Sequence, residues 1–206
     1  MPVTISTAHL ITTGGKVWSA SHELLTFLLS SLPETPLTIL ELGSGCGHLG
    51  LSLAEARPEC RVILTERQLD GGFQHLMENL QNNLHIKNVH CFQLDWADNG
   101  EFRNVYDFAL SLGHPITLVG SELVYNPTTC NLLCLLIDKF SRKNKNVTFI
   151  YAHSLNRFSM IDYDLFTKLS SAGFCITSHK EPDRVLTDLA AMPPSLSALC
   201  QALCVM

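Results

Sequence analysis

Three glycines at alternate positions, Gly43, Gly45 and Gly47, have the spacing that points most directly to ligand chemistry. Glycine lets the backbone adopt positive φ, and it lets a ligand approach with no Cβ in the way. These glycines follow an apolar run, residues 39–42, and precede residues 49–54, which indicate a buried strand and the start of a helix. A helix start also offers backbone N–H groups that have no partner inside the helix. The stretch therefore predicts a nucleotide-binding turn in the first half of a βαβ unit.

The residues of this turn allow two interpretations of its ligand. Gly45, Gly47 and Gly50 match the G-x-G-x-x-G pattern of dinucleotide-binding turns, in which a helix N-terminus binds a pyrophosphate. Glu41, followed by the three alternate glycines, instead resembles motif I of class I methyltransferases, which bind S-adenosylmethionine. That ligand has no phosphate and has a cationic amino acid end, so an acid such as Glu41 suits it. The second interpretation is favoured, and a glycine turn without any ligand is the third possibility.

A second acid, Glu66, closes the next expected strand, residues 61–65. In nucleotide-binding α/β folds, an acid at the tip of the second strand accepts hydrogen bonds from the ribose hydroxyls. Hydrogen bonds to a charged group contribute roughly 1.5–3 kcal/mol each. Glu66 is therefore predicted to hold a ribose, and the alternative is an exposed surface carboxylate.

The elements that must position these residues alternate along the chain. The expected strands are residues 39–42, 61–65, 88–94, 115–121, 147–152 and 174–177, and the expected helices are residues 17–32, 49–57, 73–84, 127–140 and 163–172. Residues 97–114 are expected to form an irregular connection with a short helix near residues 102–105, and no strand is expected after Glu181. This alternation predicts an α/β fold with a mostly parallel sheet and helices on both faces.

Length and composition indicate one globular domain over residues 1–206, in which residues 1–13 and 182–206 carry no clear pattern. The chain is 46% hydrophobic and 16% charged, which excludes the disordered class. Its formal charge of -5 argues against nucleic acid as a partner. No apolar run approaches the length that spans a membrane. We expect a monomer.

The eight cysteines contain no CxxC pair, and no histidine lies at zinc-finger spacing from them. We therefore expect no metal site. No signal peptide opens the chain, so reduced thiols are expected. The predicted location is the cytoplasm, with the nucleus as a second location.

Four stretches, in the same order, resemble one protein family. They are Gly15-Lys-Val-Trp-Ser-Ala, the motif I stretch Ile39-Leu-Glu-Leu-Gly-Ser-Gly-Cys-Gly, Leu94-Asp-Trp and Ser121-Glu-Leu-Val-Tyr. The chain resembles the seven-β-strand, non-SET protein lysine methyltransferases of the methyltransferase-like kind, methyltransferase family sixteen, over about residues 14 to 175. The resemblance implies a Rossmann-like class I methyltransferase fold with a mostly parallel twisted sheet, and it favours S-adenosylmethionine over a dinucleotide.

The resemblance also implies the site residues. Contact with S-adenosylmethionine is expected for Trp18, Glu41, Gly43, Gly45, Gly47, Glu66, Asp95, Trp96 and Ser121. Within this set Asp95 and Trp96 would border the adenine. Glu122 and Tyr125 occupy the family's catalytic motif, usually Asp-x-x-Tyr, where they would orient the substrate amine and wall its pocket.

These residues predict an enzyme that transfers a methyl group from S-adenosylmethionine to a lysine of a protein substrate. Two alternatives stay open. One is a methyltransferase that acts on arginine or a small molecule. The other is a non-catalytic module that binds S-adenosylmethionine, or nothing, and works through a protein partner. The absence of an expected seventh strand favours this module. In the motif that carries the predicted catalytic residues, Glu122 is one methylene longer than the family's usual aspartate.

Overall fold

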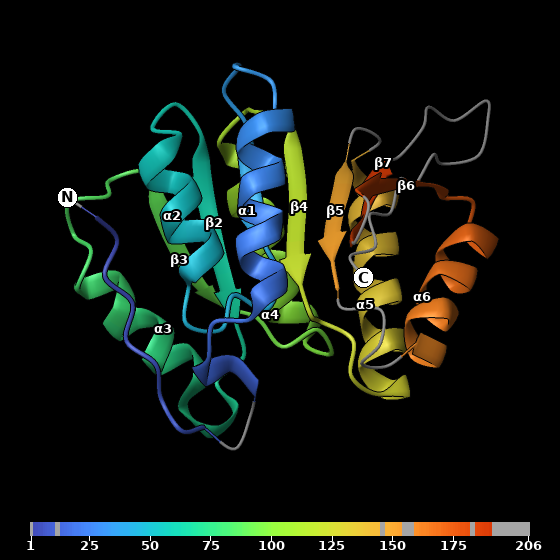
Figure 1. Cartoon of the computed structure of the whole chain (residues 1–206), viewed down its shortest axis with the longest axis horizontal. Coiled ribbons are helices and arrows are strands. Elements are labelled where there is room, and N and C mark those ends of the chain that lie inside the picture. Colours follow the sequence, from blue (N-terminus) through green and yellow to red (C-terminus); the bar gives the residue numbers. More distant parts are fainter. Residues whose placement is uncertain (1, 11–12, 145–146, 154–158, 182–183, 191–206) are drawn as a thin grey trace. The chain divides into compact units, whose positions relative to one another are not determined.

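The computed structural model describes residues 2–10, 13–144, 147–153, 159–181 and 184–190 of the chain (Figure 1). The chain forms two compact units, Met1–Pro115 and Ile116–Met206. Strands and helices alternate in both, as the sequence predicts. The C-terminal part of the unassigned tail, residues 191–206, lies outside the described residues.

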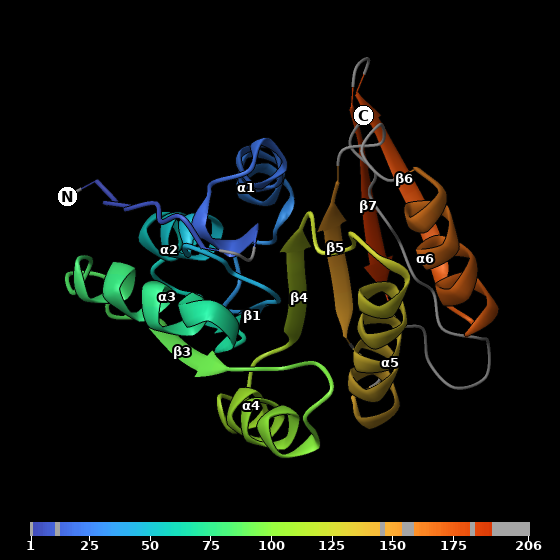
Figure 2. The ribbon, with the colours of Figure 1, turned by 90° about the horizontal axis from the view of Figure 1, so that it is seen from below.

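The first unit contains three parallel strands, β1 (Thr38–Glu41), β2 (Arg61–Glu66) and β3 (Val89–Gln93), in the order β3-β2-β1. Helices α1 (Ser19–Ser31) and α4 (Asn99–Ser111) lie on opposite faces of these strands, as Figure 1 and Figure 2 show. Every residue of β1 is buried, which explains its unbroken apolar run. Because the strands are parallel and Glu66 pairs with Gln93, β2 and β3 end at the same edge.

The other helices of this unit follow β1 and β2. They are α2 (His48–Ala56) and α3 (Gly72–Gln81), with short 3₁₀ turns η1 (Thr13–Gly15) and η2 (Leu69–Gly71). The expected bounds of α1, α2 and α3 agree with the observed ones within three residues.

Helix α4 corrects the expectation of an irregular connection over residues 97–114. It has 13 residues and begins after Asp98, whose side chain accepts hydrogen bonds from the backbone N–H groups of Gly100 and Glu101. Its buried face repeats at helical spacing and comprises Phe102, Val105, Tyr106 and Ala109. The prediction was wrong because the polar residues between these positions obscured the apolar stripe.

The second unit contains strands β4 (Ile116–Ser121), β5 (Thr148–Ala152), β6 (Cys175–Glu181) and β7 (Arg184–Ala190), in the order β4-β5-β7-β6. β4 and β5 are parallel, whereas β7 is antiparallel to both of its neighbours. Helices α5 (Pro127–Lys143) and α6 (Ser159–Ser171) complete the unit. Pro127 opens α5, and Asn126 and Thr129 form a reciprocal capping box there.

Strand β7 contradicts the expectation that no strand follows Glu181. Glu181 pairs with Arg184, so only residues 182–183 connect β6 to β7. The strand escaped prediction because Arg184 and Asp188 interrupt its apolar residues. The missing strand therefore no longer supports a non-catalytic module. Across the described ranges, no helix is both long enough and apolar enough to cross a membrane.

Candidate functional site

The glycine turn between β1 and α2 requires glycine at each of the alternate positions. Gly43, Gly45 and Gly47 have φ values of 60°, 54° and 83°, in the left-handed region that side chains with a Cβ disfavour. Gly47 is also the N-cap residue of α2. The backbone N–H of Ser44 donates to the carbonyl of Thr65 at 2.8 Å, which fixes the turn against the end of β2.

Gly45 also lies against the backbone of Gly14. A Cβ on Gly45 would lie 2.8 Å from the carbonyl oxygen of Gly14, closer than real Cβ atoms approach. The protein's own backbone therefore requires glycine at position 45. A bound ligand would need the same space free of a side chain.

The carboxylate of Glu66 lies beside the glycine turn. Its Oε2 accepts a hydrogen bond from the backbone N–H of Gly45 at 2.7 Å, and its Oε1 accepts one from the backbone N–H of Arg67 at 3.1 Å. Burial raises the pKa of this carboxyl above its usual value. An ionised carboxylate offers about four lone-pair positions, so about two remain for a pair of ribose hydroxyls. The residues present therefore fit S-adenosylmethionine at this position.

Glu41 has a different environment from the one expected for a cofactor contact. It is 3% exposed, and its Oε2 accepts a hydrogen bond from the backbone N–H of Gly50 at 3.0 Å. Burial raises its pKa to about 8. The Glu41 side chain thus serves the first turn of α2, and its contact with the cofactor stays a prediction.

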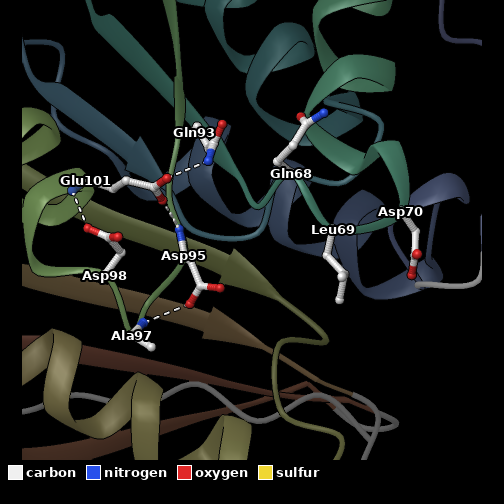
Figure 3. A pocket seen from close by; sticks show the side chains of 8 residues that line it. All are labelled: Gln68, Leu69, Asp70, Gln93, Asp95, Ala97, Asp98 and Glu101. Carbon is white, nitrogen blue, oxygen red and sulfur yellow. Dashed lines mark hydrogen bonds between the residues drawn. The ribbon is translucent and has the colours of Figure 1, made fainter.

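An open pocket of about 640 Å³ lies at the edge where β2 and β3 end (Figure 3). Its lining residues come from the segment after β2 and from the segment around the end of β3, and they are Gln68, Leu69, Asp70, Gln93, Asp95, Ala97, Asp98 and Glu101. Figure 3 shows the two groups facing each other across the pocket. Asp95, expected to border the adenine, is among them, and the adjacent Trp96 is half-buried.

Glu101 fixes the backbone at this pocket, a role that the sequence analysis missed. Its carboxylate accepts hydrogen bonds from the backbone N–H of Asp95, at 2.6 Å, and from the side-chain amide of Gln93. The Oδ1 of Asp95 accepts a hydrogen bond from the N–H of Ala97 at 2.9 Å. A signal was available, because an Asp followed three positions later by a Glu is typical of a helix N-terminus. The spacing of Asp98 and Glu101 would have predicted the start of α4, although not the contact of Glu101 with the N–H of Asp95.

Trp18 lies immediately before α1 and is half-buried. Its indole N–H donates a hydrogen bond to the carbonyl of Thr13 at 3.1 Å. The Oγ of Ser21 donates to the carbonyl of Trp18 at 2.7 Å. These bonds fix the segment that joins Gly14 to α1, and contact between the indole ring and the cofactor stays a prediction.

In the second unit, Glu122 follows Ser121 at the end of β4 and has a φ of 54°. Left-handed backbone is rare for a residue with a long side chain. The Glu122 N–H donates to the carbonyl of Ala152 at 2.9 Å, and the Val124 N–H lies 3.4 Å from the hydroxyl of Tyr151. β5 thus holds the segment that carries the two predicted catalytic residues.

Tyr125 is half-buried and lies at the start of α5. Its backbone N–H lies 3.4 Å from Oγ1 of Thr129, and the Thr129 N–H donates to Oδ1 of Asn126 at 2.9 Å. The capping box therefore fixes the backbone on the other side of the segment. Tyr151 is fully buried, and no pattern in the sequence indicates its contact with this segment. Among the described residues, no group of three or more His, Cys, Asp or Glu side chains could hold a metal ion.

Comparisons with known proteins bear on the family and the fold of the chain. Over 68 residues, 33% of this chain, the sequence is 43% identical to the release factor glutamine methyltransferase of Escherichia coli (strain K12), and the match spans only 24% of that enzyme. Among solved structures, precorrin-6y C5,15-methyltransferase from Geobacter metallireducens superposes with a TM-score of 0.57 at 14% identity, covering 92% of this chain and 94% of that one. The apo form of the S-adenosylmethionine-dependent methyltransferase SibL gives 0.57 at 15% identity, covering 84% and 56%.

The sequence model of the family "Lysine methyltransferase" matches residues 2–172, so the chain belongs to this family. Its fold is the Rossmann-like class I methyltransferase fold, as the sequence predicts.

Proposed function

Starting from this family membership, we propose that the chain is an S-adenosylmethionine-dependent methyltransferase that methylates a lysine side chain of a protein substrate. The observation that carries the proposal is the left-handed backbone of Glu122, at a φ of 54° directly after β4. This conformation costs roughly 1–2 kcal/mol for a residue with a Cβ. Such strain is typical of residues that bind a ligand or take part in catalysis.

The proposal assigns cofactor binding to the first unit. The Glu66 carboxylate accepts the ribose hydroxyls, and the glycine turn leaves room for the methionine part. The pocket lined by Asp95 takes the adenine. When bound, S-adenosylmethionine supplies a methyl group activated by its sulfonium centre.

The acceptor amine must be neutral before it can form its bond to the methyl carbon. A lysine with a pKa of about 10.4 costs roughly 4 kcal/mol to deprotonate near pH 7.4. The proton leaves to water, and a desolvated pocket lowers the cost. A carboxylate side chain accepts hydrogen bonds, so Glu122 suits an amine that donates them. In this proposal Glu122 directs the nitrogen lone pair, and the Tyr125 hydroxyl gives the amine a second partner.

The similarity to a release factor glutamine methyltransferase makes glutamine the second candidate acceptor. A glutamine amide presents both a donor and an acceptor, and a carboxylate pairs with only one of them. The chain's net charge of -5 also suits a cationic substrate. Lysine is therefore favoured over glutamine.

The experiment that tests the substrate class is methylation of a cell lysate with methyl-labelled S-adenosylmethionine and this protein. Acid hydrolysis preserves N-methyl-lysine and N-methylarginine, which chromatography separates, whereas N-methylglutamine releases volatile methylamine. We expect the label in methyl-lysine. Label in methylamine, in methylarginine or in small molecules would instead identify glutamine, arginine or a small molecule as the acceptor. Cofactor binding without any labelled product would favour the non-catalytic module.

Two substitutions at the same position test the role of Glu122. Glu122→Gly should raise stability by about 1 kcal/mol, because glycine tolerates the left-handed conformation, and should abolish turnover. Glu122→Asp, the matched control, keeps the carboxylate and should retain turnover. Melting temperature and single-turnover rate are measured on the same preparations. A glycine variant that keeps the wild-type rate would show that Glu122 has no catalytic role.

A further inference from the structure

An extended N-terminal segment, residues 2–10, runs alongside α3, and we call it the N-terminal strap (Figure 1). Val3 and Ile5 are half-buried, whereas Thr4 and Ser6 are exposed. This alternation is typical of a strand, although the strap belongs to no sheet.

Two asparagines of the chain take the place of a neighbouring strand. Asn83 accepts from the Thr4 N–H at 2.8 Å and donates to the Thr4 carbonyl at 2.7 Å. Asn79 accepts from the Ser6 N–H at 2.9 Å and donates to the Ser6 carbonyl at 3.0 Å. Asn83 lies in the turn just after α3, and a helical rise over four residues would be about 6 Å, close to the roughly 6.6 Å that two residues of an extended chain span.

Asn79 makes contacts that Asn83 does not. Its Oδ1 also accepts a hydrogen bond from the hydroxyl of Ser6 at 2.7 Å. Its Nδ2 also donates to the carbonyl of Cys46, inside the glycine turn, at 2.9 Å. The corresponding second bond of Asn83 goes to the carbonyl of Asn79 at 2.7 Å. Asn79 is fully buried, so the Cys46 carbonyl would lose a needed partner if the amide were removed, whereas the Ser6 carbonyl would still have Nε2 of His75 at 3.0 Å.

The chain returns to the glycine turn soon after the strap. The Ala8 N–H donates to the carbonyl of Gly15 at 2.9 Å, which closes a loop. A Cβ on Gly14 would lie 3.4 Å from Cα of Gly45 and 3.8 Å from Oε2 of Glu66. Gly14 therefore lies close to the expected ribose acceptor, and the strap reaches the glycine turn through Asn79.

We propose that Asn79 is a positioning residue for cofactor binding, because it holds the docked N-terminal strap and the glycine turn in one arrangement. The proposal rests on the proposed binding of S-adenosylmethionine. Asn79 acts through Cys46 and Ser6 and does not itself touch the cofactor. Its loss should raise the KM for S-adenosylmethionine and leave kcat at saturating cofactor unchanged.

The test is calorimetric titration of the full chain with S-adenosylmethionine. Asn79→Ala should weaken binding about tenfold or more, which corresponds to about 1.4 kcal/mol. Asn83→Ala is the matched control, because it removes the same kind of strap contact one helical turn away, and it should stay within about threefold of the wild type. Equal losses in both variants, or none in either, would overturn the proposal.

A second pair of variants acts from the strap side and keeps the core intact. Ser6→Pro removes the N–H and the hydroxyl that donate to Oδ1 of Asn79, and Thr4→Pro removes the N–H that donates to Oδ1 of Asn83. Only Ser6→Pro should weaken the cofactor about tenfold. This pair decides the question if Asn79→Ala does not fold.

Hydrogen exchange separates positioning from mere stability. Binding and strap docking are linked, so S-adenosylmethionine should slow exchange of residues 2–10 in the wild type but not in Asn79→Ala. A purely structural Asn79 would lower the melting temperature and leave this protection unchanged. A wild-type chain that binds no S-adenosylmethionine would instead refute the proposed function, which the wild-type titration reveals by itself.

Discussion

Replacing Glu41 with glutamine should make the protein more stable at alkaline pH and leave its stability at acidic pH nearly unchanged. The side chain is 3% exposed, and its carboxyl accepts a hydrogen bond from the Gly50 N–H at 3.0 Å. Glutamine has nearly the same shape, and its amide oxygen can accept the same bond. The substitution therefore removes the titration and keeps the packing.

The magnitude follows from the pKa of Glu41, which burial raises from 4.5 to about 8. A carboxyl whose folded pKa is raised contributes its full stability below the unfolded pKa and loses it as the pH rises through the folded pKa. The window is therefore pH 4.5 to about 8. At about 1.36 kcal/mol per unit, wild-type stability should fall by on the order of 4 kcal/mol relative to Glu41→Gln between about pH 5 and about pH 9.

The assay is urea denaturation of both proteins across this pH range, with the difference in unfolding free energy plotted against pH. Glu34→Gln, which changes an exposed acid in the segment between α1 and β1, controls for the loss of a surface charge. The reasoning is refuted if the wild-type and Glu41→Gln curves stay parallel from about pH 5 to about pH 9.

Two further substitutions test the predicted cofactor contacts of the first unit. Gly45→Ala should weaken the binding of S-adenosylmethionine and lower the melting temperature, because the new Cβ would lie 2.8 Å from the Gly14 carbonyl oxygen at a φ of 54°. Calorimetry measures the affinity and thermal unfolding measures the stability, and wild-type values for both would contradict the close approach. Glu66→Gln should weaken S-adenosylmethionine about tenfold or more by removing the charged ribose acceptor. An analogue without the 2′ and 3′ hydroxyls should bind the wild type and Glu66→Gln with the same affinity. If the wild type binds this analogue more tightly than Glu66→Gln does, by the same factor as for S-adenosylmethionine, Glu66 does not hold the ribose.

The sequence predicted the elements whose burial is uniform. The fully buried β1 reads as an apolar run because both of its faces are covered. The glycine turn was recognised because positive φ at Gly43, Gly45 and Gly47 leaves a visible trace in residue type. Where one physical requirement governs every position of a segment, the pattern of residue types is enough to predict the element.

Helix α4 and strand β7 escaped because their patterns are mixed. α4 buries one face and leaves polar residues on the other, so its signal lies in the cap at Asp98 and in every third or fourth residue. β7 carries Arg184 and Asp188, and antiparallel pairing with two neighbours defines it more than an apolar run does. Pairing partners far along the chain cannot be seen in a local window.

The predicted catalytic residues were recognisable only by resemblance. Nothing in the residue types around Glu122 indicates its left-handed backbone, and its N–H donates to a carbonyl of β5, which lies far along the chain. Tyr151 takes part through its hydroxyl near the Val124 N–H, and its position inside an apolar strand reads simply as core.

The polar residues that the sequence analysis missed share a physical reason. Turns at a sheet edge leave backbone N–H and C=O groups without partners in a helix or strand, and a buried group of this kind costs free energy unless a side chain pairs with it. Asn79 meets that need at Cys46, and Glu101 meets it at Asp95. Glu66 does so at Gly45 while it is also the expected ribose acceptor. Binding of the cofactor and stability of the turn are therefore coupled through the same carboxylate. A loss of affinity in a Glu66 variant therefore reports on the ribose only if the variant stays folded under the conditions of the titration, which its unfolding free energy shows.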